Sequence, residues 1–119
     1  MNFKGVIMTK KEWKLVKLKI LKELNDMLFL LNEENKWCRL ALARDIEGNI
    51  LPNSYMEEAT SFCLMGAAYR LGISEETINL LNRCANEENF IDIVELNDKT
   101  SYKIVIMFLN EVLKFVKRK

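Results

Sequence analysis

Two matched stretches, WCRLALARDIEG at residues 37–48 and FCLMGAA at residues 62–68, decide how this chain folds. Each places a cysteine beside an aromatic residue and continues with small residues, and the first contains an adjacent Arg-Asp pair. A free cysteine beside an aromatic ring usually behaves as a small buried apolar residue. We therefore expect tight contact between helices at these two stretches, with one charged corner at Arg44 and Asp45.

Composition and length indicate a single helical domain. The chain has 119 residues, of which half are hydrophobic, and it contains only four glycines and one proline. That composition is unlike a protein rich in turns or disorder, and a chain of this length corresponds to one domain. We predict an all-α fold: one compact domain over residues 1–119, built as a bundle of four main helices plus a short helix near residues 36–43.

The first main helix is expected from Thr9 to about Asn35. Thr9 and Glu12 form a capping box, in which each side chain satisfies a free amide at the helix start. Apolar residues then recur at helical spacing. The other main helices are expected over residues 55–71, 74–87 and 101–116.

Local signals predict where these later helices begin and end. Asn53 or Ser54 is expected to cap the second helix, with Glu57 completing a second capping box, and Gly72 to end it. Ser74 is expected to open the third helix.

The stretch before the last helix is predicted to be irregular. Phe90–Leu96 contains β-branched residues that favour extended backbone, but no partner strand is evident, so we expect a packed loop. Asp98 or Thr100 is expected to cap the last helix.

The cysteines point to a reducing compartment. Cys38, Cys63 and Cys84 are dispersed and odd in number, and residues 1–8 lack the apolar run of a secretory signal. No uncharged apolar run approaches the roughly 18 to 20 residues that span a bilayer. We expect reduced thiols in a soluble cytoplasmic protein with no membrane partner.

The residue inventory argues against most enzyme classes. The chain has no histidine, so the usual general base near neutral pH and any Cys-His or Ser-His-Asp nucleophile are absent from it. The cysteines lack the close pairs of zinc modules, and no glycine-rich phosphate loop occurs. We expect no catalytic residue, no metal and no cofactor, so an enzyme of unknown type is only the third hypothesis.

Arg44 and Asp45 are the leading polar candidates, with two interpretations left open. In a binding site, the guanidinium would hold a phosphate or carboxylate while Asp45 orients it. In a structural role, Asp45 would close the turn before Gly48, and Arg44 would bind helix-end carbonyls or an acid such as Asp98. The candidate ligand-binding residues are Arg44, Asp45, Trp37, Asn97 and Asp98; the candidate structural residues are Cys38, Cys63, Gly66 and Gly48.

Charge is distributed unevenly, although the net charge is only +1. Residues 1–22 carry +6, residues 23–98 carry −10 and residues 99–119 carry +5. Such asymmetry either steers a polyanion to the basic ends or reflects terminal helices that lie against an acidic middle. We favour the second interpretation. The first helix offers few arginines or exposed aromatic residues that read bases, so nucleic acid is not an expected partner.

The motifs resemble a family of small helical proteins of unknown function from bacteria and their viruses. Its pattern is Trp-Cys-x-x-Ala-Leu-Ala-Arg-Asp-x-x-Gly, then Cys-Leu-x-Gly-Ala, then Asn-Asp before a final helix, and the similarity covers about residues 20–116. The chain differs at Phe62, where Trp is common, and in its lysine-rich start. The resemblance implies a helical fold, a bacterial cell or an infected host cell as the setting, and no agreed activity. The shared residues, to which it assigns no role, are Trp37, Cys38, Arg44, Asp45, Cys63, Gly66, Asn97 and Asp98.

The first functional hypothesis is therefore a small helical binding or interaction protein, such as a virus-encoded accessory factor, that acts through a protein partner or as a homo-oligomer. The alternative is a protein that binds or sequesters a small anionic ligand, a nucleotide or another phosphate-bearing signal. In that alternative, Arg44 would neutralise phosphate and Trp37 or Tyr69 would stack on a base.

Overall fold

The computed structural model describes residues 2–3 and 6–119, with side chains from residue 8 onward, and this part of the chain is mostly helical. Met1, Lys4 and Gly5 lie outside the described residues. The helices are α1 (Lys10–Leu30), η1 (Glu34–Lys36, a 3-10 turn), α2 (Leu64–Leu71), α3 (Glu75–Glu87), α4 (Ile93–Lys99) and α5 (Tyr102–Lys117). Two antiparallel pairs of very short strands accompany them: β1 (Asn2–Phe3) with β2 (Val6–Ile7), and β3 (Ala43–Arg44) with β4 (Ser61–Phe62).

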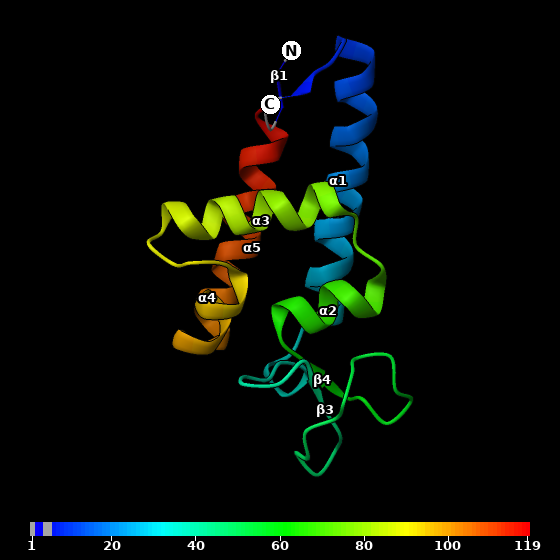
Figure 1. The fold of residues 1–119 in the computed structure, drawn as a ribbon, viewed down its shortest axis with the longest axis vertical. Helices are drawn as coiled ribbons and strands as arrows, with labels where there is room; N and C mark the ends of the chain where they lie inside the picture. Colours follow the sequence, from blue (N-terminus) through cyan, green and yellow to red (C-terminus); the bar gives the residue numbers. More distant parts are fainter. Residues whose placement is uncertain (1, 4–5) are drawn as a thin grey trace.

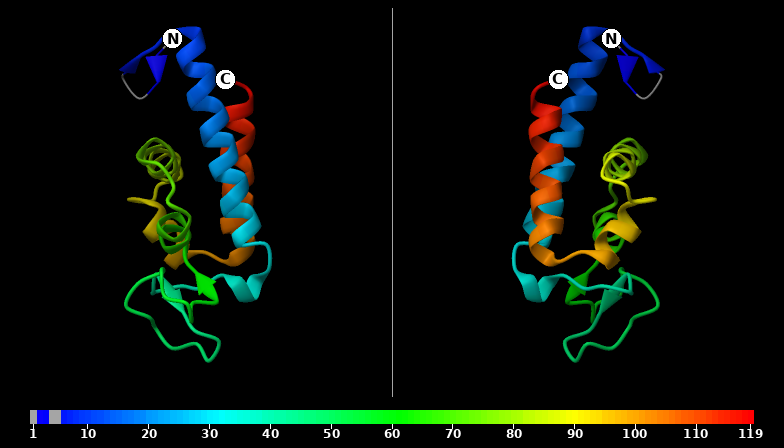
Figure 2. Two further views of the ribbon diagram at one scale, coloured as in Figure 1. Left: turned by 90° about the vertical axis from the view of Figure 1, so that its right-hand side faces the viewer. Right: turned by 90° about the vertical axis from the view of Figure 1, so that its left-hand side faces the viewer.

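The helices form two layers (Figures 1 and 2). α1 and α5, the first and last helices of the chain, lie side by side and antiparallel in one layer, and we call this pair the hairpin. α2, α3 and α4 make up the other layer. The loop between η1 and α2 lies at one end of the molecule and the termini lie at the other. Side-chain hydrogen bonds tie the hairpin at both ends: the Trp13 indole donates to the carbonyl of Lys119 (3.3 Å), and the Tyr102 hydroxyl donates to the carbonyl of Leu31 (2.6 Å).

The core lies between these layers. It is built from one face of each long helix, including Ile20, Leu24 and Met27 of α1 and Val105 and Leu109 of α5, all fully buried. Burying one such side chain contributes roughly 1.5–3 kcal/mol, so this interface supplies most of the stabilisation. None of the described helices has both the length and the apolar composition that crossing a membrane requires.

The prediction of a mostly helical fold is confirmed, although the short strand pairs and the additional helix α4 differ from the predicted all-α bundle of four main helices. The predicted short helix near residues 36–43 is wrong. Trp37 already has extended backbone (φ −116°, ψ 144°), and Leu40 lies in the left-handed region (φ 63°) that a leucine rarely adopts. The backbone amides here are paired with other elements. Cys38 N donates to the carbonyl of Phe62 (3.1 Å), and Leu40 N donates to the Asp98 carboxylate (2.9 Å).

The second main helix begins at Leu64, later than the sequence predicts. Ser54 does not cap a helix: its hydroxyl is buried and has no hydrogen-bond partner among the described residues. Arg70 holds the preceding turns in place by donating to the carbonyls of Ser54 and Met56, at 2.9 Å each. Cys63 is the actual N-cap, and its sulfur accepts a hydrogen bond from Gly66 N at 3.2 Å.

The predicted loop at Phe90–Leu96 is also wrong in part, because α4 starts at Ile93. Asp92 caps it by accepting from Glu95 N (2.9 Å), a signal that outweighs the β-branched residues. Asp98 and Thr100 do not cap the last helix; Ser101 does, through Ile104 N.

Other boundaries agree with the sequence. The capping box of Thr9 and Glu12 is present in both directions, although α1 ends at Leu30 and not near Asn35. α3 follows Ser74 and ends at Glu87 as predicted. Gly72 ends α2 in the left-handed conformation (φ 66°), which glycine adopts without a Cβ clash.

A carboxylate of α1 takes over the capping of α3. Glu23 accepts hydrogen bonds from Ser74 N (2.7 Å), from the Ser74 hydroxyl (2.6 Å) and from the Thr77 hydroxyl (2.6 Å). Ser74 itself makes no side-chain capping bond. The start of α3 is therefore anchored to the hairpin layer as well as to its own turn.

Replacing Glu23 with alanine should lower the free energy of unfolding by about 1–3 kcal/mol, because it leaves the amide and two hydroxyls of this cluster without their acceptor. Urea denaturation measures the change. Glu58→Ala is the control, since Glu58 is exposed in the loop and makes no hydrogen bond or ion pair in the described structure; equal effects of the two changes would contradict the assigned role.

Candidate functional site: a junction organised by Asn97

One buried amide side chain joins the three motifs found in the sequence. Asn97 is fully buried near the end of α4. Its Oδ1 accepts hydrogen bonds from the Trp37 indole (2.6 Å) and from Leu64 N (3.0 Å), and its Nδ2 donates to the carbonyl of Cys38 (3.1 Å). Asn97 therefore connects α4, the segment after η1 and the first turn of α2.

Asp98 extends this junction. Its Oδ1 accepts from the Asn97 side chain (3.1 Å) and from Leu40 N (2.9 Å). The second bond stabilises the left-handed backbone of Leu40, which costs of order 1–3 kcal/mol for a residue of this kind. In this backbone conformation Leu40 points outward and is 72% exposed.

Gly66 is needed because the loop passes directly against α2. A Cβ atom at this position would lie 1.8 Å from the carbonyl oxygen of Leu42, which is backbone and cannot rotate away. The sequence predicts tight helix-to-helix packing around Gly66, whereas the close neighbour is the backbone of Leu42, in the non-helical segment before β3. That segment is also held by Cys63 N, which donates to the same carbonyl at 3.3 Å.

The thiols near this junction are buried. Burial raises the pKa of Cys38 and of Cys63, with the Ser61 hydroxyl and the Gly66 amide respectively acting as the largest opposing influence. Cys38 donates to the carbonyl of Ala41 (3.6 Å). Thiols with raised pKa values are protonated at neutral pH and are poor nucleophiles.

Arg44 and Asp45 lie in the adjoining loop and do not form an ion pair with each other. The Arg44 guanidinium donates to the carbonyls of Gly48 (2.9 Å) and Arg39 (3.0 Å). The Asp45 carboxylate accepts from the amides of Asn49 (2.8 Å) and Glu47 (3.0 Å), and these bonds, with that of Asn49 first, lower its pKa. These contacts shape the turn around Gly48, whose φ is +87°.

Of the five candidate ligand-binding residues, the structure brings Trp37, Asn97 and Asp98 together. The Trp37 ring is half-buried, with the Arg39 guanidinium 5.6 Å from its centroid and the Tyr102 ring tilted against it at 6.1 Å. Arg44 and Asp45 contact other parts of the loop. Among the described residues, no three Cys, Asp or Glu side chains converge in a way that could hold a metal ion.

A hollow of about 350 Å³ opens beside the junction. It is mostly apolar, and the Asp98 carboxylate is its one charged group. Its lining consists of Leu40, Ala41, Leu42, Cys63, Val94 and Asp98.

Sequence reasoning did not find this hollow, since four of its six lining positions are ordinary hydrophobic residues. It also missed the left-handed Leu40, for which no glycine or asparagine signals a turn. The available signal was the pair Asn97-Asp98 within an apolar stretch: a buried amide must find partners, and it finds them across the molecule.

Replacing Asn97 with leucine should lower the free energy of unfolding by about 3 kcal/mol or more, because the Trp37 indole, Leu64 N and the Cys38 carbonyl would then be buried without partners. Chemical denaturation followed by tryptophan fluorescence measures this. Asn110→Leu provides the control, as Asn110 is exposed on α5 and bonds only to its own helix. If Asn97→Leu lowered the free energy of unfolding no more than Asn110→Leu does, the junction would be dispensable for stability.

Alkaline pH should unfold the protein partly through Cys84. Burial, with a smaller contribution from Glu87, raises its pKa to about 11, whereas an unfolded thiol has a pKa of about 8.5. Because the folded protein holds this thiol in its protonated form more strongly than the unfolded chain does, the thiol's contribution to stability is fully present below the pKa of the unfolded chain. That contribution is lost as the pH rises through the pKa of the folded protein. The free energy of unfolding should therefore fall more steeply for the wild type than for Cys84→Ala between these pH values; parallel curves would contradict it.

Comparison with models of protein families, with curated proteins and with solved structures gives no match for this chain.

Proposed function

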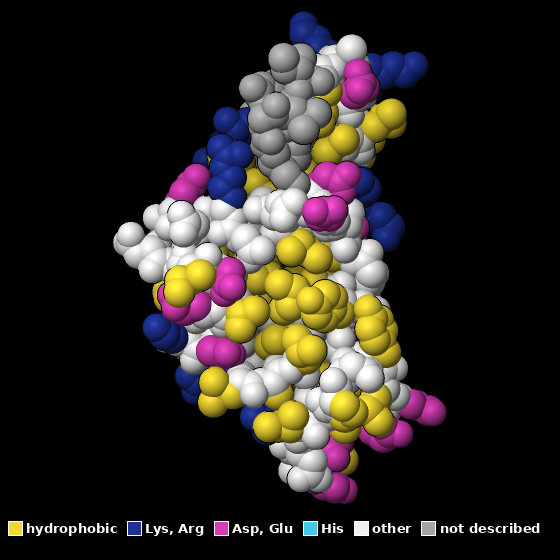
Figure 3. All heavy atoms as spheres, in the orientation of Figure 1, with side chains coloured by type: hydrophobic (Ala, Val, Ile, Leu, Met, Phe, Trp, Pro, Cys, Tyr) yellow, Lys and Arg dark blue, Asp and Glu magenta, His cyan; other side chains and the backbone are white. Residues whose placement is uncertain are grey.

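We propose that this chain is a non-enzymatic protein-binding module whose binding surface is formed by α2, α3, α4 and the loop at Leu40. We call this surface the acidic face. The observation that most directly supports this proposal is that hydrophobic side chains gather in the middle of the acidic face and acidic side chains border it (Figure 3). The exposed or half-buried hydrophobic residues of these helices, of the loop at Leu40 and of the connection between α3 and α4 include Leu40, Met65, Tyr69, Leu71, Ile78, Ile91 and Val94.

An apolar surface of this kind favours a protein partner. Contiguous exposed hydrophobic side chains rimmed by polar groups mark interaction sites in soluble proteins. The hollow beside Val94 would receive one apolar side chain, and Asp98 at its edge would pair with a cation next to that side chain.

Charge supports a basic partner. Residues 61–99, which include α2, α3 and α4, carry seven acidic and three basic side chains, and Lys99 pairs with Glu95 within α4 (3.4 Å). Few of these charges are neutralised by the basic terminal helices: Lys19 to Glu76 (3.2 Å) is the ion pair that crosses between the layers in the described residues. The field of this face is therefore directed at solvent, where it steers cationic partners.

The junction under the acidic face supplies rigidity. Asn97 and Gly66 fix the loop against α2, so the exposed Leu40 side chain is presented on a backbone that is already ordered. A surface organised before binding loses less conformational entropy when a partner docks. The partner that fits best is an amphipathic helix with hydrophobic residues on one side and Lys or Arg beside them.

The phosphate-binding alternative has weaker support in the geometry. Both terminal nitrogens of Arg44 donate to backbone carbonyls, and the hollow carries a carboxylate and not a cation. An enzyme with a cysteine nucleophile is disfavoured by the burial that raises the thiol pKa values.

A labelled peptide of leucine and lysine arranged as an amphipathic helix tests the proposal by fluorescence anisotropy. The wild type should bind it, and the double variant Tyr69→Gln with Val94→Gln should bind at least about tenfold more weakly, or about 1.4 kcal/mol. The matched control is Ile46→Gln, which removes an 82% exposed hydrophobic side chain in the turn before Gly48, outside α2, α3 and α4. Equal binding by all three proteins, or equal binding of a scrambled peptide, would contradict the proposal.

A further inference from the structure

The opposite side of the molecule has its own exposed hydrophobic residues. Leu15, Leu18 and Phe29 lie on the side of α1 away from the core, since helical spacing places them opposite buried Ile20 and Leu24. Phe29 is 78% exposed and Leu15 is 63% exposed. In the ribbon, α1 and α5 form the layer opposite α2, α3 and α4 (Figure 2), so the side of α1 away from the core is the outside of the hairpin.

α5 continues this surface. Met107 is 52% exposed on the side of α5 opposite buried Val105, Leu109 and Val112. Because the Trp13–Lys119 and Tyr102–Leu31 bonds align the two antiparallel helices along their whole length, their outer sides form one surface. We call this surface the hairpin face.

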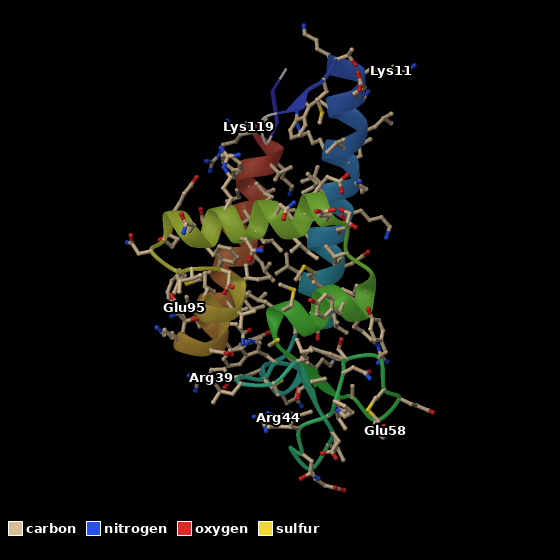
Figure 4. All side chains as sticks on the ribbon, viewed as in Figure 1. Lys11, Arg39, Arg44, Glu58, Glu95 and Lys119 are labelled. Atoms are coloured by element: carbon tan, nitrogen blue, oxygen red, sulfur yellow. The ribbon has the colours of Figure 1, made fainter. Side chains whose placement is uncertain are left out.

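The hairpin face is basic where the acidic face is acidic. Residues 10–30 and 102–119 together carry eleven basic and four acidic side chains, a net charge of +7, against −4 for residues 61–99. Exposed Lys11, Lys22, Lys103 and Lys114 stand on its outer side, where Lys22 and Lys114 are paired with Asp26 and Glu111. Lys11 and Lys119 lie at the end of the hairpin far from Glu58 and the loop (Figure 4).

We infer that the partner of the acidic face is a second copy of this chain, docked through its hairpin face. This inference rests on the proposed function and names its partner. The hairpin face has the features that the acidic face requires: large exposed hydrophobic side chains set among lysines. The two surfaces differ, so the contact is heterologous, and a dimer of two copies leaves one free acidic face and one free hairpin face. Repetition gives a ring or an open chain of subunits.

Complementation between two variants tests the heterologous contact. Leu15→Gln with Phe29→Gln removes the hairpin face, and Tyr69→Gln with Val94→Gln removes the acidic face; glutamine suits these helical positions. In sedimentation velocity at low ionic strength, the wild type should form larger species as concentration rises, and salt should reduce them. Each variant alone should remain monomeric. An equimolar mixture should form a dimer and nothing larger, because one intact face of each kind remains.

Other outcomes overturn the inference in distinguishable ways. A dimer that one variant abolishes and the other leaves intact would indicate a two-fold contact of like faces. A wild type that stays monomeric while the leucine-lysine peptide still binds would leave the proposed function standing with a different partner. If the wild type neither self-associates nor binds the peptide, both the inference and the proposed function are overturned.

A vesicle experiment tests a lipid surface as the partner of the hairpin face. If monomers bind phosphatidylserine vesicles and the variant with Leu15→Gln and Phe29→Gln does not, the hairpin face is assigned to a lipid surface. Circular dichroism confirms that each variant is folded.

Discussion

The structure depends on the need of one buried amide for hydrogen-bond partners. Asn97 is enclosed by the molecule, and a polar group in that position costs several kcal/mol unless its donor and acceptor are satisfied. Its partners come from residues 37, 38 and 64, which no single element brings together. The extended path of the chain after η1 follows from this requirement, because a helix there would have paired the Cys38 carbonyl internally.

The surface chemistry follows from the same junction. Once the loop is fixed against α2, with glycine at position 66 permitting the approach, Leu40 is held outward and the hollow forms between it and Val94. The buried thiols fill space beside the junction and are protonated at neutral pH. A site with rigid backbone, apolar side chains and a carboxylate is suited to recognising another surface, and we propose that role for it.

Sequence alone could predict the features whose causes are local. Thr9 with Glu12 sets the start of α1, and Gly72 sets the end of α2, because both act on the backbone within one helical turn. The sequence-based prediction failed where hydrogen bonds between distant residues outweigh the helix propensity of a short segment. The residues after Cys38 favour helix by themselves, whereas their non-helical path depends on hydrogen bonds to Phe62, Asn97 and Asp98, which are distant in the sequence. Charge asymmetry was visible in the sequence, whereas the ion pair between Lys19 and Glu76, which joins the two layers, was not.

The two indole groups offer the most direct measurement of the central claim. The Trp37 indole donates to buried Asn97, whereas the Trp13 indole donates to the carbonyl of the last residue, at the end of the hairpin. Hydrogen exchange of the two indole protons, followed by NMR, reports how often each bond opens. We predict that the Trp37 proton exchanges only on near-global unfolding and far more slowly than that of Trp13. Exchange of the Trp37 proton as fast as the Trp13 proton would contradict the account, because the junction would then open without unfolding the protein.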